Sequence, residues 1–403
     1  MSSVETIESS NAAATPRSGA SRLILFLTVF IDLLGFGIVI PFLPLFAERM
    51  GVGAAGVGLV LAIYSAAQLV CAPILGRISD RVGRRPVIML GLLGSAIGYL
   101  IYGFATSFFW LLVSRAVHGA CAGTVSTAQA YMADTTDESE RAHGMGLIGA
   151  AFGLGFVLGP AVGGLLGRSG LRIPVLFASA LCLANFLFAA VALPESHRGD
   201  RGPQLGLAQI AEPWFNITQN LHGPLLRLFS LAFVFTFVFA ALETTFALVA
   251  AKVYGFGAAG IGGLLGFAGL VQAIAQGYVL GKIVKRTGEA WLIMAGAIAM
   301  AVGLAPLGSM SSPSLLLLLL TLVAVGYGFG SPSVASLISK TATRKLQGEV
   351  LGVNQSALSL ARIFGPIAAG MLYESLGASA PYLGGAIVML AALALVRGIR
   401  NSA

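Results

Sequence analysis

Long runs of apolar residues recur along almost the whole chain. Each is about 20 residues long, the length that a helix needs to cross about 30 Å of hydrocarbon. About twelve such runs lie near 23–47, 55–76, 86–106, 108–132, 144–167, 172–193, 226–251, 258–282, 289–309, 313–338, 349–373 and 379–397. They are much longer than the roughly 10-residue alternating segments of a membrane β-barrel. The pattern therefore predicts membrane-spanning helices, whose backbone groups are satisfied internally.

Composition supports this prediction. Of the 403 residues, 57% are hydrophobic and only 10% are charged. A soluble fold of this size cannot enclose that much apolar surface, so lipid must cover much of it. The predicted fold class is an all-α membrane protein. The three cysteines, Cys71, Cys121 and Cys182, all lie inside apolar runs and indicate neither a disulfide framework nor a metal site.

The net charge of +8 is distributed unevenly between alternate connections of the runs. One side carries Arg17, Arg22, Arg77, Arg81, Arg84, Arg85, Arg141, Arg198, Arg201, Arg227, Lys282, Lys285, Arg286, Lys340, Arg344, Lys345, Arg397 and Arg400, and the other carries Arg49, Arg168, Arg172 and Lys252. Basic connections lie on the cytoplasmic side of a membrane, so both termini are predicted to be cytoplasmic and the number of spans even. The charge thus reflects topology, and no nucleic-acid partner is expected.

Polar segments divide the chain into parts. Residues 1–21 are rich in Ser, Ala and Thr and are predicted to form a disordered cytoplasmic arm. A signal peptide is the alternative interpretation of the first apolar run, but that run is too long and contains Asp32 and two prolines. The longest polar interruption separates the runs six and six. We therefore expect an N-terminal six-helix bundle over 22–197, a cytoplasmic linker over 198–224 and a C-terminal six-helix bundle over 225–403.

The two halves repeat each other in sequence. Residues 76–84 resemble residues 281–289, and Gly159-Pro160 matches Gly365-Pro366, in both cases about 205 residues further on. Two matches at one offset indicate an internal duplication. Duplicated halves are how many transporters build a site at the membrane midplane, so the bundles are expected to be pseudo-symmetric.

Charged residues inside the runs are candidates for function, because a carboxylate in mid-membrane costs about 2.5–3.5 kcal/mol on an insertion scale. We hypothesise that Asp32 takes up and releases a proton and that Arg115 sets its affinity. A purely structural Asp–Arg pair between two helices is the alternative. Glu243 suits a second proton site, a contact for cationic substrates or an exposed position on a cavity wall. Arg362 is a further intramembrane cation without an assigned partner.

Two glycine-containing segments predict close helix contacts. Gly76 and Gly83 bracket a loop with Asp80, Arg81, Arg84 and Arg85, in which the glycines allow close approach and a tight reversal and Asp80 can accept hydrogen bonds from the arginines. Gly155, Gly159 and Gly163 form a small-residue stripe in 144–167, with a bend expected at Pro160. We expect this stripe to contact the run 258–282, or simply to pack tightly.

Polar and aromatic side chains within the runs either hydrogen-bond across helices or line a substrate cavity. Those assigned to the cavity are Gln68, Gln129, Tyr131, Phe239, Gln272, Gln276, Asn354 and Gln355. A large apolar cavity with few polar anchors suits a site that accepts varied ligands.

Five motifs along the chain, in their order and spacing, resemble those of the twelve-helix drug/proton antiporters of the major facilitator superfamily, most closely the tetracycline-exporter-like branch. They are Asp32-x-x-Gly-x-Gly, the Gly76 to Pro86 loop, Leu112-x-x-Arg115-x-x-x-Gly119, Tyr131-Met-Ala-Asp134 and Gly146-x8-Gly155-x3-Gly159-Pro160-x2-Gly163. The resemblance extends from about residue 24 to the end. It implies a bacterial inner-membrane exporter of small amphipathic or hydrophobic compounds that exchanges them for protons by alternating access. It also implies a cytoplasmic gate at Gly76–Arg85 and an antiporter motif at Gly146–Gly163.

The resemblance further implies a monomer whose partners are a small-molecule substrate, protons and the lipid bilayer, with no cofactor beyond the proton gradient. Motifs of metalloproteases, nucleotide-binding loops and serine hydrolases are absent from the sequence, so an enzyme is not expected. A sugar or metabolite symporter or facilitator of the same fold is the alternative. Tetracycline exporters carry a histidine in helix 8, which this chain lacks, so a generic amphipathic drug is expected rather than a metal-chelated tetracycline.

Overall fold

The computed structural model describes residues 18–136, 138–196, 223–309, 312–341 and 347–400. Within these ranges the regular structure is helical and includes no strand, which confirms the predicted all-α class. Eleven helical segments of the described residues are long and apolar enough to cross a membrane, and Glu289–Leu304 is a shorter apolar helix. Most of the predicted arm and linker lies outside the described residues. Residues 18–21 of the predicted arm are helical, because α1 begins at Ser18.

The first half of the chain forms α1 (Ser18–Val39), α2 (Phe42–Arg49), α3 (Ala54–Val82), α4 (Arg84–Gly103), α5 (Phe108–Cys121), α6 (Thr124–Asp134), α7 (Glu138–Leu166), the 3-10 turn η1 (Gly167–Ser169) and α8 (Arg172–Ala192). The second half forms α10 (Gly223–Lys252), α11 (Ala258–Ile274), the π-helical turn η3 (Ala275–Val279), α12 (Leu280–Thr287), α13 (Glu289–Leu304), α14 (Pro313–Thr341), α15 (Gln347–Leu376) and α16 (Ala380–Arg400).

Three predicted runs are interrupted. The run 23–47 divides into α1 and α2 at Pro41, which has no backbone N–H to continue the first helix. The run 108–132 divides into α5 and α6 at Ala122 and Gly123. The run 258–282 contains η3 and continues as α12 to Thr287. Apolar length therefore predicted where the chain crosses, but local backbone chemistry decided where the helix breaks.

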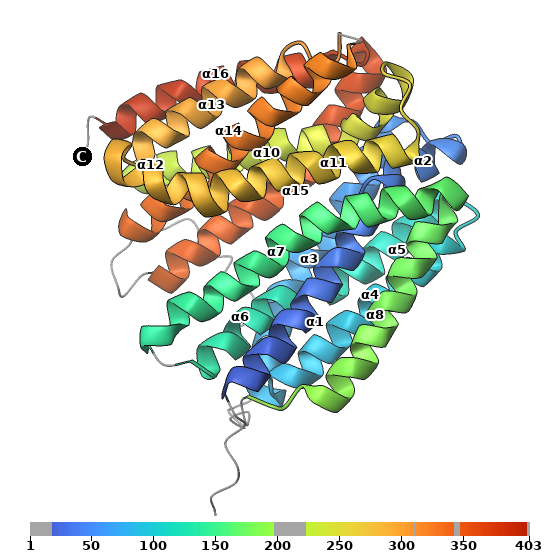
Figure 1. Cartoon of the computed structure of the whole chain (residues 1–403), viewed down its shortest axis with the longest axis vertical. Coiled ribbons are helices and arrows are strands. Elements are labelled where there is room, and N and C mark those ends of the chain that lie inside the picture. Colours follow the sequence, from blue (N-terminus) through green and yellow to red (C-terminus); the bar gives the residue numbers. More distant parts are fainter. Residues whose placement is uncertain (1–17, 137, 197–222, 310–311, 342–346, 401–403) are drawn as a thin grey trace, which may run out of the picture.

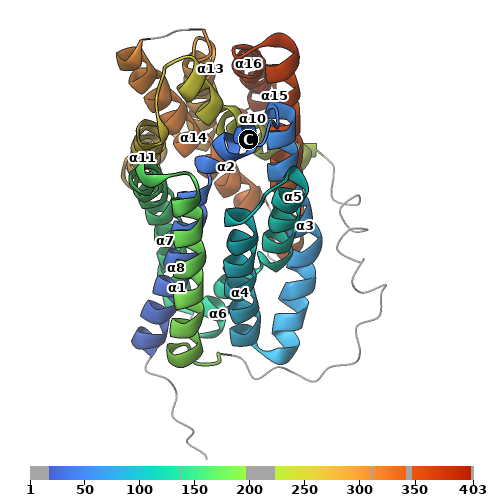
Figure 2. The same cartoon turned by 90° about the vertical axis from the view of Figure 1, so that its right-hand side faces the viewer.

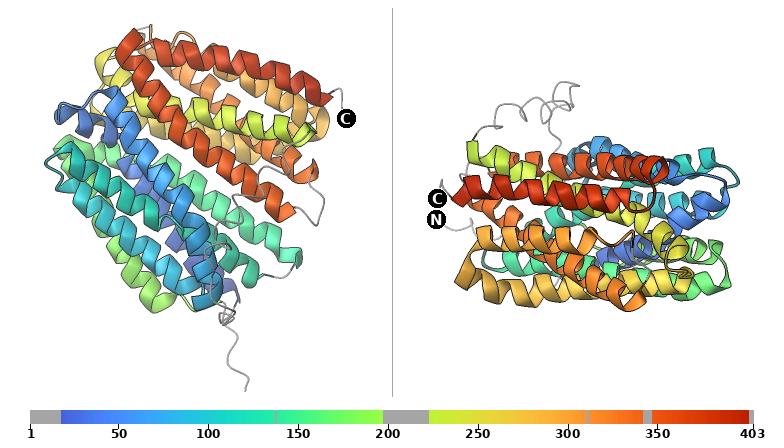
Figure 3. Two further views of the ribbon diagram at one scale, coloured as in Figure 1. Left: turned by 180° about the vertical axis from the view of Figure 1, so that it is seen from behind. Right: turned by 90° about the horizontal axis from the view of Figure 1, so that it is seen from above.

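The two halves of the chain form two halves of the molecule (Figure 1). Helices α1–α8 lie together, and α10–α16 lie together, as the turned view and the views from behind and above also show (Figures 2 and 3). The ribbons of the two halves meet near α2 and lie apart at the opposite end, where α6 and α12 are found. The main contacts between the halves join α3 to α15, α7 to α11 and α2 to α10.

Buried apolar clusters form separately within each half. One cluster in the second half contains Phe235, Phe246 and Tyr382. Two clusters in the first half are built around Phe42 and Tyr131 respectively. The fully buried residues of each cluster therefore come from one half alone, although Leu45 and Ala258 pack against the cluster of the other half.

Candidate functional site

Asp32 lies within the apolar helix α1, and its side chain remains partly exposed. Ser95 of α4, which is itself buried, lies within hydrogen-bonding range of the Asp32 carboxyl group. A carboxyl group in a membrane-spanning helix needs a polar partner or access to water. Asp32 has a partner on one side and remains accessible on another, as a site that exchanges protons requires.

Arg115 of α5 is buried, with 3% of its surface exposed. Its guanidinium lies over the rings of Tyr99 and Tyr102, with the central carbon 5.5 and 5.2 Å from the ring centres. Such stacking stabilises a cation in an apolar environment. Among the described side chains, Arg115 forms no ion pair with Asp32, and its Nε and one terminal nitrogen have no hydrogen-bond partner.

Two tyrosines lie near both Asp32 and Arg115. Tyr64 of α3 and Tyr99 of α4 both lie within electrostatic range of each charged group. We call Tyr64 and Tyr99 the tyrosine layer; both lie near Asp32 and Arg115, and no described salt bridge joins these two charged residues. That arrangement leaves the Asp32 carboxyl group free to change its protonation state without breaking an ion pair.

His118 is a residue that the sequence did not assign to the site. It is 4% exposed and lies one helical turn after Arg115. Its ring centre is 4.6 Å from that of Tyr99, 4.9 Å from Tyr64 and 6.1 Å from Phe36. The i, i+3 spacing from Arg115 was the only available signal, because it places both side chains on neighbouring parts of one helix face.

The second half contributes Glu243 from α10 and Arg362 from α15. Glu243 is partly exposed within an otherwise buried stretch of its helix, and Arg362 acts on it electrostatically. No described ion pair joins them, and the buried Nε of Arg362 has no hydrogen-bond partner. The structure thus gives Arg362 a neighbouring carboxylate, which the sequence alone did not identify.

Tyr64 also lies within electrostatic range of Arg362, although the two residues come from opposite halves. Beside Glu243, the rings of Phe239 and Tyr327 stack with centres 4.1 Å apart and planes inclined by 15°. Both rings are partly exposed. The central site therefore combines two acids, two arginines and stacked aromatic surfaces supplied by both halves.

The predicted cytoplasmic gate is organised around Arg84 at the start of α4. Its Nε donates to Asp134 at 2.9 Å, its terminal nitrogen donates to Ser79 at 2.8 Å, and it also pairs with Asp80. Its backbone N–H donates at 2.8 Å to Glu195, which comes shortly after α8. The start of α4 is thereby joined to the ends of α3 and α6 and to the segment that follows α8.

Other members of this segment have different roles. Gly83 has φ +103°, a conformation that favours glycine, and so permits the predicted tight reversal. Arg85 donates through its side chain to the Ala190 carbonyl, and its backbone N–H donates to Glu195. The prediction of close helix approach at Gly76 is wrong in this structure, because a Cβ there would meet nothing within 4 Å. Arg81 lies in the last turn of α3.

The glycine stripe of α7 packs against α1 rather than against α11. A Cβ on Gly155 would lie 2.8 Å from Leu33, and one on Gly159 would lie 2.6 Å from Gly37. Gly163 similarly abuts Ile38. The predicted contact with the run 258–282 exists, but the adjacent face of α7 makes it. The stripe's four-residue spacing predicts one shared face without identifying which neighbour covers it.

The contact between α7 and α11 depends on glycines of both helices. A Cβ on Gly262 would lie 2.3 Å from the carbonyl oxygen of Pro160, and one on Gly164 would lie 3.1 Å from Gly262. The helix α7 continues through Pro160 to Leu166. Gly146 does not join these contacts, since a Cβ there would meet nothing within 4 Å.

The ends of the halves near α2 are also held together by polar contacts. Lys252 of α10 pairs with Glu48 of α2 at 2.5 Å. Glu374 of α15 accepts a hydrogen bond at 3.1 Å from the backbone N–H of Ala55, in the first turn of α3. Close backbone packing accompanies them, because a Cβ on Gly58 would lie 2.2 Å from the carbonyl oxygen of Pro366.

The residues assigned to the substrate cavity do not share one environment. Gln68 donates to the Ala122 carbonyl at 3.3 Å, and therefore forms a hydrogen bond between helices. The assignment of Tyr131 to the cavity is wrong, because its side chain is fully buried in the core of the first half and its hydroxyl donates to the Pro194 carbonyl at 3.0 Å. Gln272 is partly exposed, Asn354 is 9% exposed with an unpartnered oxygen, and Gln129, Gln276 and Gln355 are exposed.

Comparison with known proteins identifies the family. The family model described as Major Facilitator Superfamily matches residues 25–366 and 277–401. The chain belongs to the major facilitator superfamily. Multidrug resistance protein 2 of Bacillus subtilis (strain 168) is 32% identical over 376 residues, which cover 93% of each chain. Tetracycline resistance protein, class C, of Escherichia coli is 33% identical over 395 residues, covering 95% of this chain and 98% of that protein.

Solved structures agree with this membership. The human organic anion transporter MFSD10 (TETRAN) has a TM-score of 0.72 and 28% identity, covering 95% of this chain and 100% of that one. The nucleoside transporter NupG has a TM-score of 0.77 at 13% identity, covering 94% of this chain and 99% of that one, which shows the shared fold alone. The predicted resemblance to drug-efflux members of the major facilitator superfamily is confirmed by the tetracycline and multidrug resistance relatives.

Proposed function

We propose that this protein exports small amphipathic or hydrophobic drug-like compounds in exchange for protons. The observation that carries the proposal is the central site, in which partly exposed acids of both halves lie near the buried Arg115, the partly exposed Arg362 and aromatic rings. The resistance proteins among its relatives support the same substrate class. The proton gradient supplies the energy, and no other cofactor is needed.

The proposed architecture is twelve transmembrane helices in two pseudo-symmetric six-helix bundles, residues 22–197 and 225–403, joined by a linker over 198–224. We place both termini in the cytoplasm of a bacterial inner-membrane protein that works as a monomer. The halves alternate access to the central site by rocking. In this structure, contacts near α2 close one end. At the other end, the main contacts of α6 and α12 are all with elements of their own half.

Asp32 is the proposed proton-coupling residue, and Arg115 tunes it across the tyrosine layer. A substrate and a proton compete if the substrate binds best when the carboxyl groups are ionised. Binding of one then favours release of the other, which is the requirement of an antiporter. Glu243 serves either as a second proton site or as a contact for cationic substrates.

Substrate transport in proteoliposomes tests the proposal. A pH gradient should drive accumulation of tetracycline, a cationic dye or a neutral amphiphile, with counterflow of protons detected by a pH-sensitive dye. Asp32→Asn should abolish gradient-driven accumulation while the protein still binds ligand, whereas the matched Asp200→Asn in the predicted linker should transport normally. Gradient-driven transport that survives Asp32→Asn removes Asp32 from the coupling role. Transport that is indifferent to pH in the wild type identifies a facilitator instead.

Glu243→Gln separates the two roles proposed for that residue. If Glu243 contacts cationic substrates, the variant loses transport of a cationic dye and keeps transport of a neutral amphiphile. If it is a second proton site, the variant transports both with fewer protons exchanged per substrate.

A further inference from the structure

The helix α12 presents an unusual concentration of exposed charge. None of its residues is buried, and Lys282, Lys285 and Arg286 are all exposed. It packs appreciably only on η3 before it and α13 after it. The proposed transport cycle assigns no task to these three cations.

The two copies of this segment differ in their described ion pairs, because an arginine of the first copy is paired with acids and no cation of α12 is. Arg84 pairs with Asp80 and Asp134 in the first copy. In the second copy Lys285 stands at the position of Asp80, and Glu289, which stands at the position of Arg84, pairs with Lys340 of α14. Among the described ion pairs, none involves a cation of α12.

Aromatic residues on both sides of α12 indicate that it lies at the membrane surface. Tyr278, in η3 just before α12, is 63% exposed, and Trp291, in the first turn of α13, is 46% exposed. Tyrosine and tryptophan concentrate at the boundary between hydrocarbon and headgroups. Lys282 belongs to the same level, since its ammonium donates at 2.5 Å to the Tyr278 hydroxyl and lies 3.8 Å from the ring centre.

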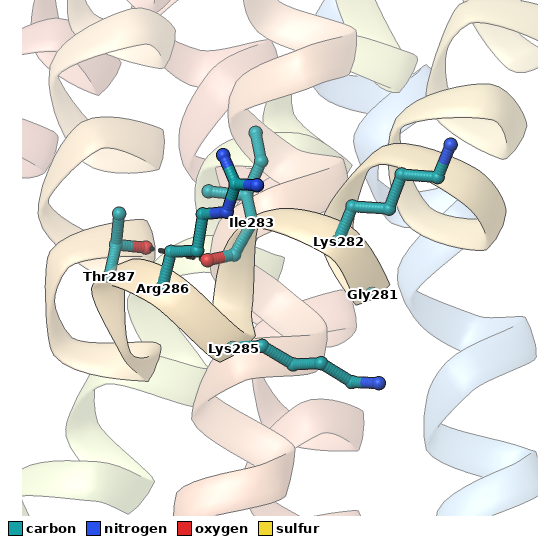
Figure 4. Close-up of a pocket in the computed structure, with 6 residues that line it drawn as sticks. All are labelled: Gly281, Lys282, Ile283, Lys285, Arg286 and Thr287. Atoms are coloured by element: carbon teal, nitrogen blue, oxygen red, sulfur yellow. Dashed lines mark hydrogen bonds between the residues drawn. The ribbon is translucent and has the colours of Figure 1, made fainter.

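A hollow of about 500 Å³ lies along α12, lined by Gly281, Lys282, Ile283, Lys285, Arg286 and Thr287. Lys282 and Arg286 are one helical turn apart and extend to the same side, while Lys285 extends in another direction (Figure 4). Two cations on one face can share a single anionic group, and a guanidinium binds phosphate oxygens with directed hydrogen bonds.

We propose that Lys282 and Arg286 bind the phosphate of an anionic phospholipid headgroup, with Tyr278 and Trp291 at the level where its acyl chains begin. An anionic lipid satisfies both the unpaired charge of the helix and its position beside the hydrocarbon. The site is independent of the substrate and of proton coupling, because it requires only that the protein spans a membrane.

Quenching of Trp291 by brominated lipids measures this binding. In a Trp110→Phe, Trp214→Phe background, the full-length protein is placed in bilayers containing brominated phosphatidylglycerol or brominated phosphatidylcholine. Phosphatidylglycerol should quench Trp291 at lower mole fraction than phosphatidylcholine. Lys282→Gln and Arg286→Gln should each reduce that preference by at least roughly fivefold, because each removes one of the two cations that share the headgroup phosphate.

Lys285→Gln is the matched control, because it removes the same charge from the same helix on a different side. It should retain most of the preference, and Trp291 emission without quencher should be unchanged in every variant. Equal quenching by the two lipids overturns the proposal, as does an equal loss in all three variants, which indicates only a diffuse surface potential. Displacement of brominated phosphatidylglycerol by inorganic phosphate assigns the site to a soluble anion and also overturns it.

Discussion

The guanidinium of Arg115 combines properties that no other side chain supplies. It is planar enough to lie on Tyr99 and Tyr102, and it remains charged where a lysine can lose its proton. We expect Arg115→Lys to reduce proton-driven substrate accumulation at least about tenfold, because stacking on desolvated rings is worth about 2 kcal/mol. Initial rates of transport in proteoliposomes measure the effect.

Tyr102→Phe is the control for this prediction, because it keeps the ring and removes a hydroxyl that has no described hydrogen-bond partner. It should transport at close to the wild-type rate. If Arg115→Lys is as active as the wild type, positive charge alone suffices and the stacked geometry has no functional part.

Residues such as Asp32 and Arg115 could be predicted from sequence because a charge in a long apolar run must have a reason to be there. How the two residues lie relative to each other could not be predicted. The tyrosine layer near both residues depends on how α1, α3, α4 and α5 pack, and no local pattern specifies that packing. The prediction that Tyr131 lines the cavity was wrong for the same reason, since its hydroxyl donates to the Pro194 carbonyl and its ring belongs to the core.

Helix α7 uses two adjacent faces for two purposes. Gly159 packs within the first half, against Gly37, so Gly159→Ala should destabilise folding by about 1–3 kcal/mol through overpacking. The expected result is a lower melting temperature in detergent and less folded protein in the membrane. Gly153→Ala on the same helix is the control, since a Cβ there meets nothing within 4 Å. Equal stability of the two variants would contradict this assignment.

Helix α11 should respond differently, because Gly262 packs against the other half. A methyl group in Gly262→Ala would lie 2.3 Å from the Pro160 carbonyl oxygen only while the halves are closed at this end. The substitution should therefore shift the population toward the alternative state by about 5-fold to about 150-fold, for an overpacking cost of about 1–3 kcal/mol.

Distance distributions between spin labels on the two halves measure that shift. Gly263→Ala changes the next residue in the same way, but its Cβ would meet nothing within 4 Å, so its distribution should match the wild type. The small-residue pattern in the sequence identified such contacts as possible. It could not say whether a given glycine serves the fold or the motion, because that depends on whether the neighbour belongs to the same half.

At the scale of the whole molecule, the duplication in the sequence predicted two similar halves, and each does bury its own core. Which state the halves adopt could not be predicted, since that balance rests on contacts between residues distant in the chain. The pair between Glu48 and Lys252 is such a contact. Its partners are 37% and 54% exposed, so we expect it to contribute up to about 1 kcal/mol to the closed end.

Glu48→Lys should consequently open the end near α2 several-fold more often, because it places two cations opposite each other. Adding Lys252→Glu restores an ion pair and should return the population toward the wild-type value. Spin labels at Ser107 and Ser375, introduced as cysteines without the three native ones, report the separation of the halves. Glu140→Gln is the control: it breaks the 2.6 Å pair with Arg22 inside the first half and should leave this separation unchanged. If adding Lys252→Glu fails to reverse the effect of Glu48→Lys, the ion pair does not stabilise the closed end, and the glycine contacts alone hold it closed.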